Sequence, residues 1–172
     1  MTGFFHHPLT PCLVATVAAL ATFAAALTTG ADLANTGWTA LLFAILASLA
    51  WIDAVSETVP DVLTVALVFT GLAHASAVGA AVLPIGAAAV LLLTVGVLHG
   101  RITGDLGWIG SGDYFLAAGV VAWFGPTQAL EVLALTTLGL LFHSLIARRA
   151  SIALAPSLAA AAALTWVGGP IL

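Results

Sequence analysis

Long apolar runs separated by short polar breaks dominate the chain. A helix needs about 20 apolar residues to cross the hydrocarbon of a bilayer, whereas a membrane barrel would show segments of about ten residues that alternate apolar and polar. Such alternation is absent here. We therefore predict an all-α, polytopic transmembrane helical bundle of about seven spans, with an N-terminal helix before a six-helix core, forming one membrane-embedded domain over residues 1–172. The predicted spans are about 12–27, 38–53, 62–82, 81–98, 114–125, 130–147 and 152–167.

Composition supports a membrane protein and excludes some classes of partner. The chain is 62% hydrophobic and 6% charged, with a mean hydropathy of +1.21, whereas a soluble domain is about 25% charged. Three arginines, no lysine and a net charge of −4 leave no basic surface for nucleic acid. Cys12 is the sole cysteine, which excludes an internal disulfide and a CxxC metal site. Because residues 1–11 lack Lys and Arg, we expect a retained first helix rather than a cleaved secretory signal.

The arginines predict the orientation of the bundle. Arg101 follows the fourth span and Arg148-Arg149 follow the sixth, so all three lie on one side, which the positive-inside rule makes cytoplasmic. The tryptophans agree, with one group at the outer ends of the spans (Trp38, Trp123, Trp166) and one at the cytoplasmic ends (Trp51, Trp108). The second span ends at Asp53 and the fifth begins after Asp113, so both acids are predicted near the cytoplasmic leaflet.

Asp113 is the first candidate for chemistry. The run from Tyr114 to Phe124 has only 11 residues, so the span is complete only if it starts near Gly107, which draws Asp113 below the membrane surface. An ionisable side chain at that depth is costly and indicates a functional site. Asp53 ends an earlier apolar run in the same way.

Two such acids at one depth predict acid–base chemistry. Like charges a few ångströms apart cannot both ionise comfortably, so the pair holds one proton, and the apparent pKa values belong to the pair. One carboxylate can then take a proton from water while the other donates to a peptide carbonyl. Gly110 and Gly112 remove side-chain bulk, so that a substrate strand can approach the acid. The alternative is that Asp113 caps a helix and Asp53 lies at the water interface.

Two motifs resemble those of the type IV prepilin peptidases. The segment DAVSETVPDVLT, from Asp53 through Pro60-Asp61 to Thr64, looks like the first signature of that family, and Gly110-Ser111-Gly112-Asp113 resembles its GxGD signature. The 60-residue separation of the acids, the segment AWFG at 122–125 and ALAPSLA around Pro156 are also similar. The resemblance covers about residues 41–160.

The resemblance implies a membrane aspartic endopeptidase that removes the basic leader of prepilins or pseudopilins at the cytoplasmic face of a bacterial cytoplasmic (inner) membrane, and so supports pilus assembly or secretion. It implies Asp53 and Asp113 as the catalytic acids, with neither metal nor cofactor, and leaves the oligomeric state open. Asp61 matches a family position that is not normally catalytic, and helix stabilisation is its alternative role. Phe115 replaces the family's usual lysine, and the cysteine-rich methyltransferase region is absent, so the chain resembles the short, peptidase-only members.

The other polar residues carry weaker predictions. Glu57, Asp61 and Asp105 are acids of the cytoplasmic loops that could attract a Lys/Arg-rich leader, with solvated loop charge as the alternative. His74, His99 and His143 lack the spacing of metal ligands, which favours ordinary interfacial or helix-packing roles for them. Glu131 is expected at the outer interface.

Three other functions stay open. A presenilin-like intramembrane protease shares GxGD, but its other acid normally follows a tyrosine, whereas Ile52 precedes Asp53. A small proton-coupled transporter could use the two acids as relays, with helices broken by Gly and Pro. A pilus-assembly scaffold would need neither acid.

Overall fold

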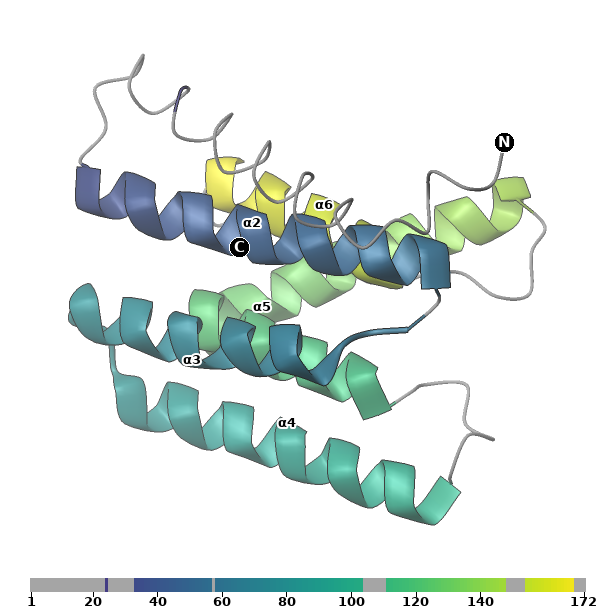
Figure 1. The fold of residues 1–172 in the computed structure, drawn as a ribbon, viewed down its shortest axis with the longest axis horizontal. Coiled ribbons are helices and arrows are strands. Elements are labelled where there is room, and N and C mark those ends of the chain that lie inside the picture. Colours follow the sequence, from purple (N-terminus) through teal and green to yellow (C-terminus); the bar gives the residue numbers. More distant parts are fainter. Residues whose placement is uncertain (1–23, 25–32, 57, 104–110, 148–153, 169–172) are drawn as a thin grey trace.

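The computed structural model describes residues 24, 33–56, 58–103, 111–147 and 154–168 (Figure 1). In this part of the chain there are five α-helices and no strand, and the helices are α2 (Leu33–Ser56), α3 (Asp61–Ala77), α4 (Val82–Thr103), α5 (Ser111–Ala147) and α6 (Leu154–Gly168). The all-α prediction is confirmed. The predicted helix at 12–27 lies outside the described residues.

α5 combines the fifth and sixth predicted spans. Gly125 interrupts its helical geometry with φ 72° and ψ 166°, a conformation that essentially only glycine adopts without strain. Pro126 follows, and its ring cannot continue the hydrogen-bonding pattern of the preceding turn. Figure 1 shows that the part of α5 beyond this bend runs back toward the end of the bundle at which α5 begins. The predicted break between the fifth and sixth spans is therefore present: α5 consists of two helical segments that meet at Gly125 and run in opposite directions.

Two of the helices are longer than predicted. α2 begins at Leu33 rather than at Trp38, and it continues past Asp53 to Ser56. α4 reaches Thr103, so Arg101 belongs to the last helical turn and not to the Gly-rich loop in which we expected it. A cation in the last turn is stabilised by the partial negative charge of the helix C-terminus, which explains why the helix continues through this residue.

Both ends of α3 are closed by backbone hydrogen bonds. Pro60 is the N-cap, and its carbonyl accepts bonds from the N–H groups of the third and fourth helical residues at 3.1 and 3.2 Å. At the other end, Gly79 has φ 73° and its N–H donates to Ser76, while the Ala80 N–H donates to Ala75 at 2.8 Å. This is the Schellman arrangement, which terminates a helix at a glycine. α3 consequently ends at Ala77, before the predicted limit at 82.

α5 is the central element of the bundle and contacts α3, α4 and α6, while α2 packs on α6 and α3. Glycines permit the closest approaches. A Cβ built at Gly119 would lie 2.5 Å from the Leu67 side chain, and one at Gly71 would lie 2.8 Å from the backbone of Trp123. Gly96 allows the same close approach between α4 and α5. Small residues at helix crossings are typical of packing in lipid, where close backbone approach replaces the hydrophobic driving force.

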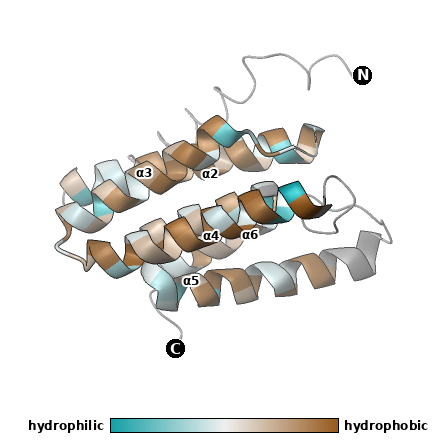
Figure 2. Ribbon diagram, turned by 90° about the horizontal axis from the view of Figure 1, so that it is seen from below, coloured by the Kyte–Doolittle hydropathy of each residue, from teal (hydrophilic) through white to brown (hydrophobic). Residues whose placement is uncertain are grey.

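The described helices have membrane character. Three contain stretches that are long and apolar enough to cross a bilayer, Ala34–Ser56, Val82–Ile102 and Gly112–Phe142, and α3 and α6 contain shorter apolar stretches. The third stretch includes the Gly125 bend. Apolar residues cover much of the ribbon surface in Figure 2. The chain is therefore a helical membrane protein, but the described residues do not confirm the predicted number of about seven spans.

Hydroxyl side chains inside the helices bond back to their own helix. The hydroxyls of Thr39, Ser48, Ser56, Thr70, Thr94, Thr136 and Thr137 donate to carbonyls four residues earlier at 2.7–2.8 Å. Because hydrocarbon offers no water to a polar group, such internal bonds are what an apolar surrounding demands. They allow these residues to lie within otherwise apolar helices.

Candidate active site

One end of the bundle gathers the helix ends that carry the predicted acids. The C-terminal ends of α2 and α4 and the N-terminal ends of α3 and α5 lie there together (Figure 1). Asp53 belongs to the last turns of α2, Asp61 opens α3 and Asp113 lies in the first turn of α5. We call this region, defined by these three residues, the acid end.

Asp53 is buried, with 5% of its surface exposed, so it does not lie at an open water interface. Its Oδ2 accepts a hydrogen bond of 2.8 Å from the backbone N–H of Ala155. Ala155 is the second residue of α6, and the first N–H groups of a helix have no partner within the helix. The carboxylate of α2 therefore supplies an acceptor to the start of α6, and this bond fixes its orientation.

Asp113 is half-buried and is the third residue of α5. It therefore lies inside the first turn rather than at the capping position before it. The partial positive charge of a helix N-terminus stabilises a carboxylate in this position. A Cβ built at the neighbouring Gly112 would lie 3.2 Å from Cβ of Val59. The first turn of α5 thus packs closely on the connection between α2 and α3, six residues after Asp53.

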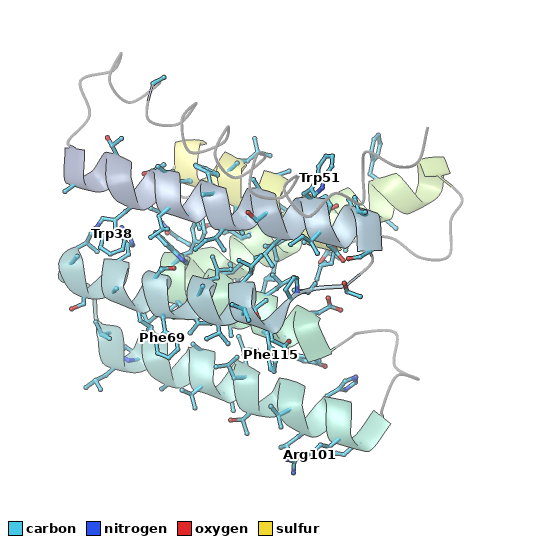
Figure 3. All side chains as sticks on the ribbon, in the orientation of Figure 1. Trp38, Trp51, Phe69, Arg101 and Phe115 are labelled. Atoms are coloured by element: carbon cyan, nitrogen blue, oxygen red, sulfur yellow. The ribbon has the colours of Figure 1, made fainter. Side chains whose placement is uncertain are left out.

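α4 forms the other neighbour of this turn. The ring of Tyr114 lies 5.3 Å from that of His99, measured between centroids. Phe115 packs against Gly96, where a built Cβ would lie 3.1 Å from the phenyl ring; Figure 3 shows the phenyl group between α5 and α4. A phenyl group at 115 therefore contributes to the packing of α5 on α4.

The remaining predicted residues fall into two groups. Pro60 caps α3, and Asp61 is exposed in the first turn of that helix rather than in the loop where it was predicted. Glu57, Gly110 and Asp105 lie outside the described residues. Within the described part of the chain, no cluster of three or more His, Cys, Asp or Glu side chains is placed to hold a metal ion.

Two further findings concern residues whose surroundings the sequence did not reveal, Glu131 and Ala155. Glu131 has only 5% of its surface exposed and is therefore enclosed by the bundle, while its depth at the outer membrane interface stays a prediction. The role of Ala155 was not predicted, because a backbone N–H has no residue-type signature. Pro156 was the available signal: it lies in the first turn of α6, where a missing N–H is tolerated, and so marks the start of that helix beside Asp53.

Comparison with known proteins identifies the family. The model of the Type IV leader peptidase family matches residues 40–147, more than half of the chain and a range that includes both acids. Searches of the curated proteins and of the solved structures found no match. The family implies a peptidase, hence a hydrolase, with a prepilin-type substrate. By its sequence, this helical membrane protein belongs to the type IV leader peptidase family.

Proposed function

We propose that the protein is an aspartic endopeptidase that uses Asp53 and Asp113 to remove the basic leader from type IV prepilins or pseudopilins at the cytoplasmic membrane face. Such cleavage would support pilus assembly or secretion. The observation that supports the proposal is that the end of α2 that bears Asp53 and the first turn of α5 that bears Asp113 lie at the same end of the bundle, where Gly112 of α5 packs on Val59 of the connection that follows α2.

The chemistry follows from one proton shared by two carboxyl groups. The ionised carboxylate takes a proton from a water molecule, whose oxygen attacks the scissile carbonyl carbon. The protonated carboxyl group donates its proton to the carbonyl oxygen, which gives a neutral tetrahedral diol. When the diol collapses, the C–N bond breaks and the carboxyl group that took the proton from water gives it to the leaving nitrogen. One diol hydroxyl gives its proton to the other carboxylate as the carbonyl re-forms. Water is the only co-reactant, and both carboxyl groups return to their starting states.

The Ala155 N–H supports a division of roles between the two acids. It holds Asp53 in one orientation from within the protein, and a fixed carboxylate suits the positioning of an attacking water. Asp113 is less buried and lies at the helix N-terminus beside a glycine, where an extended substrate can approach. We assign Asp53 to the water and Asp113 to the substrate carbonyl.

The basic leader would be attracted by the acid end. Asp61 is exposed there, and Glu57 and Asp105 belong to the connections on the same predicted side. Acidic residues around a site raise the local concentration of a cationic substrate and accelerate its association. Arg101, in the exposed last turn of α4 at this end (Figure 3), supports a cytoplasmic orientation by the positive-inside rule.

The membrane arrangement that accompanies this proposal is a single multi-pass domain of about seven spans in a bacterial cytoplasmic membrane. The proposal requires neither metal nor cofactor, and nucleic acid is not among the expected partners.

The test is cleavage by the purified protein. The full chain in detergent is incubated with a prepilin that carries a Lys/Arg-rich leader, and the products are identified by mass spectrometry. We expect one cut between leader and mature pilin, and no cut with the Asp53→Asn variant. An intact prepilin after prolonged incubation with inserted, folded wild-type protein would contradict the proposal. Proton-coupled uptake into proteoliposomes that prepilin does not affect would instead favour a transporter.

A further inference from the structure

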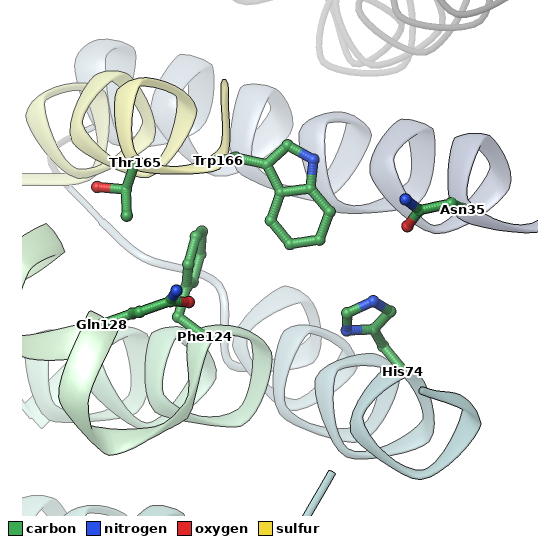
Figure 4. A pocket seen from close by; sticks show the side chains of 6 residues that line it. All are labelled: Asn35, His74, Phe124, Gln128, Thr165 and Trp166. Carbon is green, nitrogen blue, oxygen red and sulfur yellow. The ribbon is translucent and has the colours of Figure 1, made fainter. Parts of the chain in front are cut away.

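A pocket of about 310 Å³ lies at the end of the bundle opposite the acid end. It is formed by the start of α2, the end of α3, the bend of α5 and the end of α6, and its lining residues are Asn35, His74, Phe124, Gln128, Thr165 and Trp166 (Figure 4). Ligand pockets in proteins have volumes of about 300–1,000 Å³, so this one suits a small molecule.

Aromatic rings give the pocket a fixed wall. The His74 ring stacks on Trp123 with centroids 5.0 Å apart and an angle of 22°, and it also meets Trp38 and Trp166 at 5.7 and 5.6 Å. Hydrogen bonds hold two of the indoles: Trp123 Nε1 donates to the Leu67 carbonyl at 2.9 Å, and Trp166 Nε1 donates to a threonine hydroxyl of α2 at 3.2 Å. The tryptophans predicted to form an outer belt therefore pack inward around a histidine, and the site is preformed.

Two polar atoms among the lining residues have no hydrogen-bond partner among the described residues. They are Nδ1 of His74 and Oγ1 of Thr165, in side chains that are 7% and 2% exposed. An unsatisfied buried polar group costs about 1–3 kcal/mol, so native proteins rarely keep one without a purpose. In Figure 4 the imidazole of His74 extends from α3 toward the space between the α2, α5 and α6 side chains. These atoms indicate that something with hydrogen-bonding groups belongs there.

The lining residues define the chemistry of that ligand. None of the described lining residues is Asp, Glu, Lys or Arg, so this lining offers no counter-charge to a cation or an anion. The amides of Asn35 and Gln128 each offer a donor and an acceptor, and so does the Thr165 hydroxyl. The Trp166 and Phe124 rings present apolar area beside these groups. Alternating hydroxyl groups and C–H faces, as in a sugar, match such a lining.

We infer that this pocket binds an uncharged, hydroxyl-rich ring, a monosaccharide or cyclic polyol, either free or as the headgroup of a glycolipid. The inference does not depend on the proposed peptidase activity, because none of the lining residues belongs to the acid end. If the acid end faces the cytoplasm, the pocket opens toward the outer leaflet, where a lipid headgroup would lie at the same depth.

The experiment has two arms and uses the full chain. In the first, saturation-transfer NMR records binding of methyl glucoside and myo-inositol to protein in a detergent without a sugar headgroup. In the second, tryptophan fluorescence is titrated with phosphatidylcholine vesicles with and without a glucosyl diacylglycerol. We expect saturable binding in at least one arm. Binding of the free compounds would identify a soluble ligand, whereas binding of the glycolipid vesicles alone would identify a headgroup.

Two variants and a matched control decide the site. Thr165→Val removes the buried hydroxyl at constant shape, and His74→Phe removes Nδ1 while keeping a ring. Each should weaken binding about five- to tenfold, because one hydrogen bond is worth about 1 kcal/mol. Thr137→Val is the control, since this threonine is exposed on α5 and bonds only to its own helix; its affinity should equal that of the wild type. Absence of saturable binding in both arms, which would indicate a pocket filled by water only, overturns the inference. Equal affinity of the two pocket variants and the control also overturns it.

Discussion

The two ends of the bundle are built from the same helices but by opposite means. At the acid end, α2 and α5 each contribute a carboxylate: Asp53 accepts the backbone N–H of Ala155 in α6, and Asp113 lies in the first turn of α5, where the helix dipole stabilises it. At the other end, the same two helices contribute Trp38 and Trp123, which pack around a histidine with the indole N–H of Trp123 bound. We call this other end, defined by Trp38, His74, Trp123 and Trp166, the aromatic end. The difference predicts that substitutions at the acid end reduce activity more than stability, and that substitutions at the aromatic end reduce stability more than activity.

The largest expected effect is the loss of an acid. Asp53→Asn or Asp113→Asn should each lower kcat by about 10⁴-fold, the size seen when one member of a catalytic unit is removed. The stability of Asp53→Asn should change by less than about 1 kcal/mol, because the asparagine oxygen can still accept the Ala155 N–H. Steady-state cleavage of prepilin and reversible unfolding in mixed micelles measure the two quantities. A variant with kcat within tenfold of the wild type would contradict the assignment of that acid.

Substitutions at the aromatic end should lower the unfolding free energy of the protein. Gly71→Ala places a Cβ 2.8 Å from the backbone of Trp123, and this overpacking should cost about 2–3 kcal/mol of unfolding free energy. Gly86→Ala is the matched control in α4, where the nearest atom would lie 3.9 Å away. It should stabilise the helix by about 0.5–1 kcal/mol. Neither variant should change kcat while the protein stays folded. Equal stability of the two would contradict the close crossing of α3 and α5.

A smaller effect is expected at the bond between α6 and Asp53. Ala155→Pro removes the N–H that the carboxylate accepts, at a first-turn position that tolerates proline. Because a hydrogen bond to a charged group is worth about 1.5–3 kcal/mol, kcat should fall about 10- to 100-fold. Ala155→Gly keeps the N–H and serves as the control, with kcat within about twofold of the wild type. If both variants lose activity equally, the bond does not position Asp53.

The smallest effect belongs to the exposed charge. Asp61→Asn should raise KM for a Lys/Arg-rich prepilin by about two- to threefold and leave kcat unchanged, because an exposed charge pair contributes less than about 1 kcal/mol. Cleavage rates as a function of prepilin concentration at low ionic strength provide both constants. The increase should disappear at high salt, since screening removes exposed interactions. A fall in kcat instead would place this carboxylate in the reaction.

The sequence predicted most helices because apolar runs determine where a chain can enter lipid, and it predicted Asp53 and Asp113 because charge in such runs is costly. Helix ends were harder to predict. Arg101 was expected in a loop, although the helix dipole favours it in the last turn of α4. Composition could not show that Trp123 and His74 face inward, since interior and interfacial tryptophans have the same pattern along one helix. The Ala155 N–H was also hidden, because backbone donors carry no side-chain signature.

The most direct test of the central claim is a double-mutant cycle on the two acids. Prepilin cleavage is measured for Asp53→Asn, for Asp113→Asn and for the variant that carries both, with unfolding measured in parallel. If the two carboxyls share one proton over one peptide bond, the double variant should be no slower than either single variant, since each change alone disables the unit. Multiplicative losses, or substantial cleavage by either single variant, would show that the two acids do not act together.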